Sequence, residues 1–433
     1  MERVFVQSFG CRASQADGAA IEASFRESGV QPVREPGGAD LLVVNTCTVT
    51  HSADVDARRT IRNLHRDYPN AKILVTGCYA QRAPDELVGI EGVEWVVGNA
   101  EKPKIAPLVL SNREAYHGGV IVTSFDRDPA FLASPVRDVR EDRTRPNLKV
   151  QDGCSNRCSF CIIPSVRGRS RSAPAESVLE QVRDLAARYC EVVLTGINLG
   201  RWGRDLPGGL RFVDLLGLLL RETDVRRLRI SSVEPMDWSD STLRLVADES
   251  RIADHVHLPL QSGSDAVLKR MFRKYRTRHY ATRLELARKL MPDAAIGADV
   301  MTGFPGETDA EFEETVRFVE GQPFTYLHVF TYSERPGTVA VSQGPSVPPA
   351  VRRERTQVLR QLSERKNLEF RRRMVGKTLS VVTLEERGTA LTSNFLRMAM
   401  AHERAPNQML SLNAGSVSDT GLEESRPFNI LAS

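Results

Sequence analysis

Apolar and polar positions follow two different periods over the first hundred residues. Short apolar runs predict buried strands over residues 3–11, 41–47, 72–78 and 95–98. Between them, apolar residues recur every three or four positions and predict helices over residues 17–29 and 52–69, the second capped by Ser52. Strands that alternate with helices in this way predict a parallel sheet in an α/β domain.

A second series of strand and helix patterns begins at residue 147. Strands are expected over residues 147–153, 191–198, 226–235, 255–263, 294–305 and 327–337, with helical patterns between them, such as 175–189 and 309–321. Six strand–helix units fall short of the eight that close a complete barrel. The pattern therefore predicts an open, partial (β/α)6 barrel, which a long basic helix over residues 349–374 completes.

The remainder of the chain changes character. Residues 378–415 contain short β-rich runs broken by Gly, Asn and Pro, which predict a small β-barrel. We therefore expect an α/β protein made of an N-terminal parallel-sheet domain (1–115), a linker (116–145), a partial barrel (146–375) and a small C-terminal β-barrel (376–433).

Composition narrows the class of protein. The 433 residues are 41% hydrophobic and 26% charged, which is ordinary for a soluble globular protein. The net charge of +4 permits a nucleic-acid partner without requiring one. No cationic start precedes a long apolar run, and no apolar run is long enough to cross a bilayer. We therefore expect a cytoplasmic protein with no membrane partner, in which thiols stay reduced.

In that setting, seven cysteines indicate metal binding or catalysis rather than disulfides. Cys154, Cys158 and Cys161 are spaced C-x-x-x-C-x-x-C directly after the first barrel strand. A structural zinc site and an ordinary ferredoxin cluster each take four protein ligands, and this run lacks a fourth. Three thiolates would leave one iron of a cluster open to a small molecule that carries an amine and a carboxylate.

A second set of three cysteines lies in the N-terminal domain. Cys11, Cys47 and Cys78 each end one of its first three strands. Because the ligand crevice of a parallel sheet lies at the carboxyl ends of its strands, these thiols can converge on one point. Cys190 has no such set and is interpreted as a core residue. The eight histidines show no ligand spacing, so none is assigned a role.

The cysteine motif, with Phe160 before its last cysteine, resembles the radical S-adenosylmethionine superfamily. The stretches LTGINLG, RISSVEP, HLPLQSGS, GADVMTGFPGET and YSERPGT are similar to the methylthiotransferases within it, as are the N-terminal FGC, VNTCTVT and TGCY. The tail resembles the TRAM domain, an RNA-binding module. Pro336 and Gly337 in YSERPGT also predict a turn after the last barrel strand.

The resemblance implies an enzyme that attaches a methylthio group to an unactivated C–H carbon with two 4Fe–4S clusters. One cluster would be held by Cys154, Cys158 and Cys161 and would cleave S-adenosylmethionine to a 5′-deoxyadenosyl radical. The other, on Cys11, Cys47 and Cys78, would carry sulfur that a second S-adenosylmethionine methylates. Such an enzyme also needs an external electron donor and a sulfur source.

The resemblance also implies contacts to S-adenosylmethionine. They fall on Phe160, Gly196, Ser231, Glu234, Gln261 and Asp299. Most of these residues follow or end a predicted barrel strand, where polar side chains serve both binding and backbone hydrogen bonding. Arg167 and Arg169 are expected to face the substrate or the N-terminal cluster. No catalytic side chain is assigned.

Family members differ in substrate. The stretch FGCRASQAD is similar to the branch that modifies threonylcarbamoyladenosine in the tRNA anticodon loop: Arg12 and Gln15 fit its pattern, whereas Ala13 and Ser14 depart from it. The resemblance thus implies methylthiolation at C2 of N6-threonylcarbamoyladenosine at tRNA position 37. Isopentenyladenosine in tRNA and an aspartate of a ribosomal protein are the alternative substrates. A non-catalytic iron–sulfur protein that binds RNA is the alternative from another class.

Overall fold

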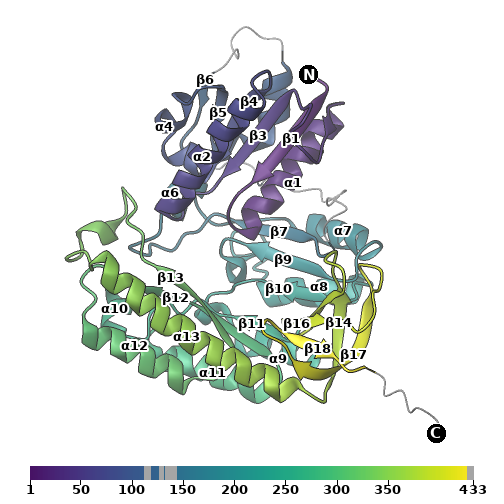
Figure 1. Cartoon of the computed structure of the whole chain (residues 1–433), viewed down its shortest axis with the longest axis vertical. Helices are drawn as coiled ribbons and strands as arrows, with labels where there is room; N and C mark the ends of the chain where they lie inside the picture. The colour runs from purple at the N-terminus through teal and green to yellow at the C-terminus, as the bar shows by residue number, and fades with distance from the viewer. Residues whose placement is uncertain (112–118, 126–130, 132–143, 427–433) are drawn as a thin grey trace.

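The computed structural model describes residues 1–111, 119–125, 131 and 144–426, which form three connected parts (Figure 1). The N-terminal part is a parallel sheet whose described strands run in the order β2-β1-β3-β4-β5-β6. Its elements are β1 (Arg3–Ser8), α1 (Arg12–Glu27), β2 (Gln31–Pro32), β3 (Leu41–Thr46), α2 (His51–Asp67), β4 (Lys72–Gly77), α3 (Cys78–Arg82), α4 (Asp85–Val88), β5 (Val93–Val97), the 3-10 helix η1 (Asn99–Lys104), α5 (Ile105–Leu110) and β6 (Gly119–Ile121).

Helices cover both faces of this sheet, as the expected parallel α/β domain requires. Every residue of β3 is buried, and its side chains alternate between two cores. Leu42 packs with α2, whereas Val43 packs with α1 and α5. One detail of the expectation is wrong: α2 is capped by Thr50, whose hydroxyl accepts from the Ala53 amide at 3.2 Å, because the helix begins before Ser52.

The central part is the expected open barrel. Its elements are β7 (Asn147–Asp152), α6 (Ile163–Arg167), β8 (Arg171–Ser172), α7 (Ala175–Ala186), β9 (Val192–Gly196), α8 (Phe212–Glu222), β10 (Leu228–Ile230), α9 (Asp240–Asp248), β11 (His255–His257), α10 (Asp265–Arg270), α11 (Thr277–Leu290), β12 (Ala295–Thr302), α12 (Asp309–Gly321), β13 (Tyr326–Thr331) and α13 (Pro349–Met374). The parallel strands run β7-β9-β10 and β11-β12-β13, and the Val233 amide donates to the His257 carbonyl where the two groups meet.

The two faces of the barrel strands differ in polarity. Leu148, Val150 and Leu194 point outward into the core beneath the surrounding helices. Their neighbours Lys149, Gln151 and Thr195 are polar and lie on the other face, because successive strand residues alternate sides. The interior of the barrel is therefore lined with polar and charged groups, which suits a polar ligand more than a packed core.

The C-terminal part is a closed β-barrel of the described strands β14 (Thr378–Thr383), β15 (Thr389–Thr392), β16 (Arg397–Ala399), β17 (Met409–Val417) and β18 (Leu422–Glu424). It packs on the end of α13 through Phe370 and Met374 (Figure 1). Arg229 of β10 donates to the carbonyls of Thr392 and Ser393, each at 3.0 Å. The small barrel therefore covers one end of the central barrel.

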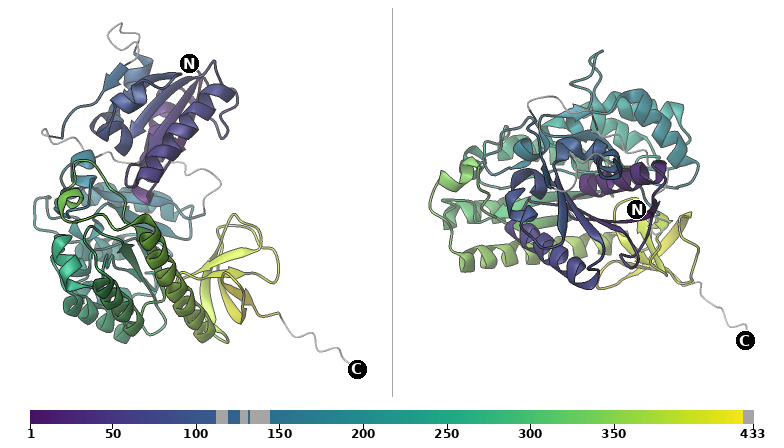
Figure 2. Two further views of the ribbon diagram at one scale, coloured as in Figure 1. Left: turned by 60° about the vertical axis from the view of Figure 1, so that its left-hand side comes forward. Right: turned by 90° about the horizontal axis from the view of Figure 1, so that it is seen from above.

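The N-terminal part sits over the opposite end of the central barrel (Figure 2). Helix α3 packs against α6 through Cys78, Ile162 and Val166. Strand β6 pairs with β5, so the N-terminal sheet extends into the segment 116–145, which is the expected linker. Most of that segment lies outside the described residues. Among the helices that the structure describes, none has the length and apolarity needed to cross a bilayer.

Candidate functional site

Three cysteines gather at the carboxyl edge of the N-terminal sheet. Cys11 precedes α1, Cys47 follows β3 and Cys78 begins α3. The first two loops touch: a Cβ on Gly10 would lie 2.8 Å from Cys47 Sγ. Burial, reinforced by the neighbouring charges of Cys78 and Cys11, raises the pKa of Cys47 to about 11. Thiols this close ionise with difficulty unless a cation or metal compensates their charge.

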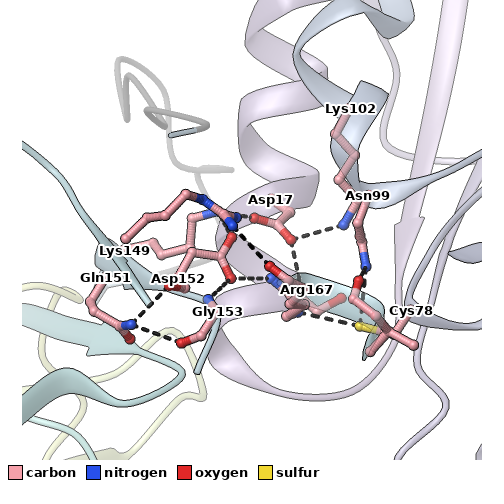
Figure 3. A network of polar contacts seen from close by, with 12 residues as sticks. Asp17, Cys78, Asn99, Lys102, Lys149, Gln151, Asp152, Gly153 and Arg167 are labelled. Carbon is pink, nitrogen blue, oxygen red and sulfur yellow. Dashed lines mark hydrogen bonds and ion pairs between the residues drawn. The ribbon is translucent and has the colours of Figure 1, made fainter. Parts of the chain in front are cut away.

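Nitrogen donors surround Cys78. Arg167 Nε donates to its Sγ at 3.3 Å, and Asn99 Nδ2 lies 3.5 Å from the same sulfur (Figure 3). Arg167 is 2% exposed and comes from α6 of the central part. Despite burial, the charges of Cys78, Asp152 and Asp17 hold the pKa of Arg167 well above its usual value. This sulfur therefore has a guanidinium and an amide donor within hydrogen-bond distance.

The same arginine belongs to a buried charge network between the two parts (Figure 3). It bonds Asp17 of α1 and Asp152 of β7, each at 2.9 Å. Lys102 reaches Asp17 at 2.8 Å, and Lys149 bonds both carboxylates. Three cations thus face two carboxylates, and the Cys78 sulfur accepts from one of these cations.

The second cysteine set lies on the loop after β7. Gly153 begins this loop at φ +67°, where a Cβ would lie 2.0 Å from the Arg169 carbonyl. Cys154 accepts from the Asn156 amide at 3.4 Å and from Asn198 Nδ2 at 3.5 Å. Arg273 Nη1 donates to Cys158 Sγ at 3.3 Å.

Burial raises the pKa of Cys161 to about 12, and the charges of Cys158 and Cys154 add to this effect. The three thiols are therefore electrostatically coupled within one loop. Both cysteine sets have similar chemistry: three neighbouring thiols, with nitrogen donors to Cys78 in one set and to Cys154 and Cys158 in the other. That donor set fits iron–sulfur clusters, which are held by thiolates and tuned by hydrogen bonds to sulfur.

A short segment links the two sets. Residues 162–167 follow Cys161 directly and end at Arg167, which touches Cys78. Ile162 and Val166 pack on Cys78 in one apolar cluster. The two thiol sets therefore lie on opposite sides of one helical turn and face the same interface.

The structure brings Glu234 to the second cysteine set and places Gly196 and Ser231 at the ends of neighbouring barrel strands. Glu234 pairs with Arg273, the donor to Cys158. Gly196 packs against Gln151, where a Cβ would lie 3.0 Å from the Gln151 side chain. Ser231 follows β10, and its hydroxyl lies 3.4 Å from that of Thr195.

Three candidates have other surroundings. Phe160 packs with Met271 and Phe304 in an apolar cluster behind the cysteine loop. Gln261 adopts φ +70°, and its carbonyl accepts from the Met301 amide at 2.8 Å. Asp299 lies within β12 and faces the barrel interior. Of the expected arginines, Arg167 reaches Cys78, whereas Arg169 is exposed.

Sequence reasoning missed the histidines of the barrel interior. His257 Nε2 lies 3.3 Å from Asp299, and His328 Nδ1 lies 3.2 Å from it. The ligand atoms of these three residues lie within 4.8 Å of one another, close enough for a metal ion. His255 stacks on Phe395 with ring centroids 4.5 Å apart. The alternation in HVH and YLHVF was the signal, since it places these side chains on one strand face.

Sequence reasoning also missed the polar partners of the cysteines. Asp17 lies on α1, Asn99 and Lys102 on η1, and Arg273 on the loop after α10, and they gather around the thiols only in the folded chain. No spacing in the sequence links these three places. The turn expected at YSERPGT also contributes a side chain that binds the N-terminal part. Its Arg335 is buried and bonds Thr48 and Asp54 of the N-terminal part.

Comparisons with known proteins agree with this architecture. Residues 148–319 match the Radical SAM superfamily, and residues 3–98 match a family described as Uncharacterized protein family UPF0004. A radical S-adenosylmethionine methyltransferase, TsrM, from Kitasatospora setae has a similar fold, with a TM-score of 0.60 at 16% identity over 78% of this chain and 77% of that one. At this identity the likeness concerns the fold alone.

Curated relatives are similar over most of the chain. Threonylcarbamoyladenosine tRNA methylthiotransferase MtaB of Bacillus subtilis is 38% identical over 89% of this chain and 85% of its own. The Aquifex aeolicus protein of that name is 35% identical, with 91% and 95% covered. The tRNA-2-methylthio-N(6)-dimethylallyladenosine synthase of Syntrophus aciditrophicus is 33% identical, with 88% and 83% covered.

Proposed function

Since the chain belongs to the radical S-adenosylmethionine methylthiotransferases, we propose that it adds a methylthio group to C2 of N6-threonylcarbamoyladenosine at tRNA position 37, beside the anticodon. The observation that carries this proposal is the pair of three-thiol sets facing one interface through residues 162–167. Two sets are what a reaction needs when one centre generates a radical and another delivers sulfur.

Cys154, Cys158 and Cys161 would hold one 4Fe–4S cluster, and Cys11, Cys47 and Cys78 the other. When bound, the first cluster and S-adenosylmethionine supply a 5′-deoxyadenosyl radical, and the second supplies sulfur that S-adenosylmethionine methylates. Three protein thiolates at each cluster leave one iron for a ligand that is not protein. An external electron donor and a sulfur source complete the requirements.

The protein's own groups prepare these sites. Arg167 and Arg273 each place a guanidinium against a cysteine sulfur, where it would tune a cluster bound through that sulfur. The side chain of Asn198 donates a hydrogen bond to Cys154 Sγ, and the residue is itself fixed, because its backbone amide donates to Gln151 Oε1 at 2.6 Å. Glu234, held by Arg273, offers a carboxylate beside the cluster for the polar groups of S-adenosylmethionine. Gly196 and Ser231, at the ends of the neighbouring strands, would add further contacts.

The polar lining of the central barrel's interior suits a nucleoside. Ser231, His257 and Asp299 line the barrel below the cysteine loop with groups that donate and accept hydrogen bonds. An adenosine taken out of its stack could enter there, as enzymes acting on a base require. The C-terminal barrel presents Arg397 and Lys377 beside the central part, where they pair with Glu386 and Asp293, and basic groups of this kind suit contact with the tRNA backbone if they exchange these partners.

The test is mass spectrometry of nucleosides from total tRNA of cells with and without this gene. We expect the methylthio form of threonylcarbamoyladenosine to disappear with the gene and to return with the wild-type gene. Cys158→Ala and Cys78→Ala should not restore it. Loss of the isopentenyl form instead would give the chain the other tRNA substrate. An unchanged nucleoside profile would overturn the proposal and direct the search to protein substrates.

A further inference from the structure

A cavity of about 350 Å³ lies where the three parts of the molecule meet. Helix α1 contributes Arg12 and Gln15, the central part contributes Arg145 and Asn147, and the C-terminal barrel contributes Glu385 and Glu386 at its exposed rim. Arg12 follows Cys11 directly, so the cavity adjoins the N-terminal cysteine set. None of the cluster cysteines or expected S-adenosylmethionine contacts lines this cavity. Arg12 and Gln15, which do line it, are identified only as residues that fit the pattern of one substrate branch.

The guanidinium of Arg12 is half-buried. Within the part of the chain that the structure describes, it takes part in no hydrogen bond or ion pair. Burial, with the charges of Arg145 and Arg229, lowers its pKa from the usual value. A guanidinium that has lost hydration without gaining a partner is costly, and an anion from outside the protein removes that cost.

Of the protein's own anions near Arg12, the buried one is already engaged, and Glu385 is exposed at the rim. Glu191 is fully buried and binds three arginines: Arg229 at 2.8 Å, Arg145 at 3.2 Å and Arg227 at 3.5 Å. Arg12 is a fourth cation in the field of this one carboxylate. At the rim, Glu386 pairs with Arg397. The region therefore carries excess positive charge directed at the cavity.

We propose that Arg12, with Arg145 behind it, binds the carboxylate of the threonylcarbamoyl group and so selects this modified adenosine. The inference rests on the proposed function and names the residue that sets its specificity. A guanidinium matches a carboxylate through two parallel N–H···O bonds. The dimethylallyl group of the other tRNA substrate has no charge and would leave Arg12 unpaired.

Position supports the assignment. The reacting carbon must lie beside the sulfur carried near Cys11, and Arg12 is the next residue along the chain. The substituent on N6 of the same adenine ring then reaches toward the start of α1. Gln15, one turn further along α1, lies 3.3 Å from Asn147 through its side-chain oxygen, so the wall of the cavity beside Arg12 is polar.

The experiment uses the reconstituted full-length enzyme and two anticodon stem–loop RNAs. One carries threonylcarbamoyladenosine, and the other carries the same group with its carboxylate converted to a primary amide. For the wild type we expect kcat/KM for the amide RNA to be lower by about tenfold or more, the size of one lost charge-assisted contact. Arg12→Gln should lose this preference, and Arg12→Lys should keep part of it.

Matched measurements separate the possible failures. Arg244→Gln removes an exposed arginine of α9, outside the cavity, and should keep the wild-type preference. Production of 5′-deoxyadenosine by Arg12→Gln reports whether the variant is folded and loaded. Wild-type enzyme that prefers neither RNA overturns the inference. An equal loss of kcat/KM for both RNAs in Arg12→Gln also overturns it, because Arg12 would then contact a phosphate. Wild-type enzyme that methylthiolates neither RNA overturns the proposed function instead.

Discussion

At the scale of single residues, buried charges hold the two thiol sets together. Arg167 bonds a carboxylate from each part and a cysteine sulfur, all within the interior. Burying so many ionised groups costs more than packing apolar side chains of the same size. The arrangement is explained by its use, because it sets a cationic donor against a cysteine sulfur where a metal cluster would bind.

Replacing Arg167 with Gln should therefore be severe. Asp17 and Asp152 would keep their lysines but lose a shared cation, which typically costs about 3–5 kcal/mol of unfolding free energy. Urea unfolding under anaerobic conditions measures this loss. Arg169→Gln is the matched control, because Arg169 is exposed, and it should stay within about 0.5 kcal/mol of the wild type. Equal stability of the two variants would contradict the role of the network.

His255 gives the stability a dependence on pH. Burial and the charges of Arg229, His257, Arg12 and His328 lower its pKa well below 6.5. Below that pH the unfolded chain takes up a proton at His255 and the folded chain does not. The stability it contributes is therefore present above pH 6.5 and is lost as the pH falls, by up to about 1.4 kcal/mol per pH unit.

Urea unfolding at a series of pH values below neutrality tests this dependence. The variant His255→Gln should show a smaller decline in unfolding free energy than the wild type over the same range. Parallel declines in the two proteins would mean that His255 is not kept neutral by its surroundings.

At the scale of elements, the junctions from strand to helix decide whether thiols converge. Gly10 sits between β1 and α1 at φ +91°, against the side chain of Cys47. The parallel sheet brings the loops to one edge, and the missing Cβ lets them touch. The strand ends bring the two cysteine loops to one edge of the sheet, and the glycine allows these loops to come into contact.

Gly10→Ala should separate the two loops. Its Cβ would lie 2.7 Å from Cys47 Cβ, and the backbone conformation would be strained. We expect bound iron to fall by about half, since one of two thiolate-held clusters is lost, while 5′-deoxyadenosine is still formed. Iron analysis and product chromatography measure the two effects. Gly37→Ala, which meets nothing within 4 Å, should keep all its iron, and full iron in Gly10→Ala would contradict the argument.

At the scale of the whole molecule, the proposed transfer needs the N-terminal and central parts in one orientation. Arg335, after β13, donates to the Thr48 carbonyl at 3.2 Å and pairs with Asp54. Both partners belong to the loop and helix that follow Cys47. The arginine therefore fixes the N-terminal cysteine set relative to the barrel.

Arg335→Gln should uncouple the two activities. Cleavage of S-adenosylmethionine involves the central set alone and should persist, whereas methylthio transfer should fall roughly tenfold, because small displacements of reacting groups cost much of the rate. The ratio of 5′-deoxyadenosine to methylthiolated RNA measures this. Arg183→Gln removes an exposed ion pair on α7 and should leave the ratio unchanged. A parallel fall of both products would show a general loss of folding instead.

The sequence by itself determined the α/β class, the six barrel strands, the C-terminal β-barrel and the two sets of cysteines. These are local properties, because strand and helix periods and strand-end positions are written in consecutive residues. Helices α12 and α13 even begin and end where their patterns do.

Only the tertiary structure decided which groups surround the thiols and the cavity. Arg167 meets Asp17 across 150 positions, and Arg335 meets Asp54 across 281. Arg12 shares its cavity with residues from all three parts. Such contacts depend on how complete sheets and barrels pack on one another, and a period of two or 3.6 residues carries no information about partners so far along the chain.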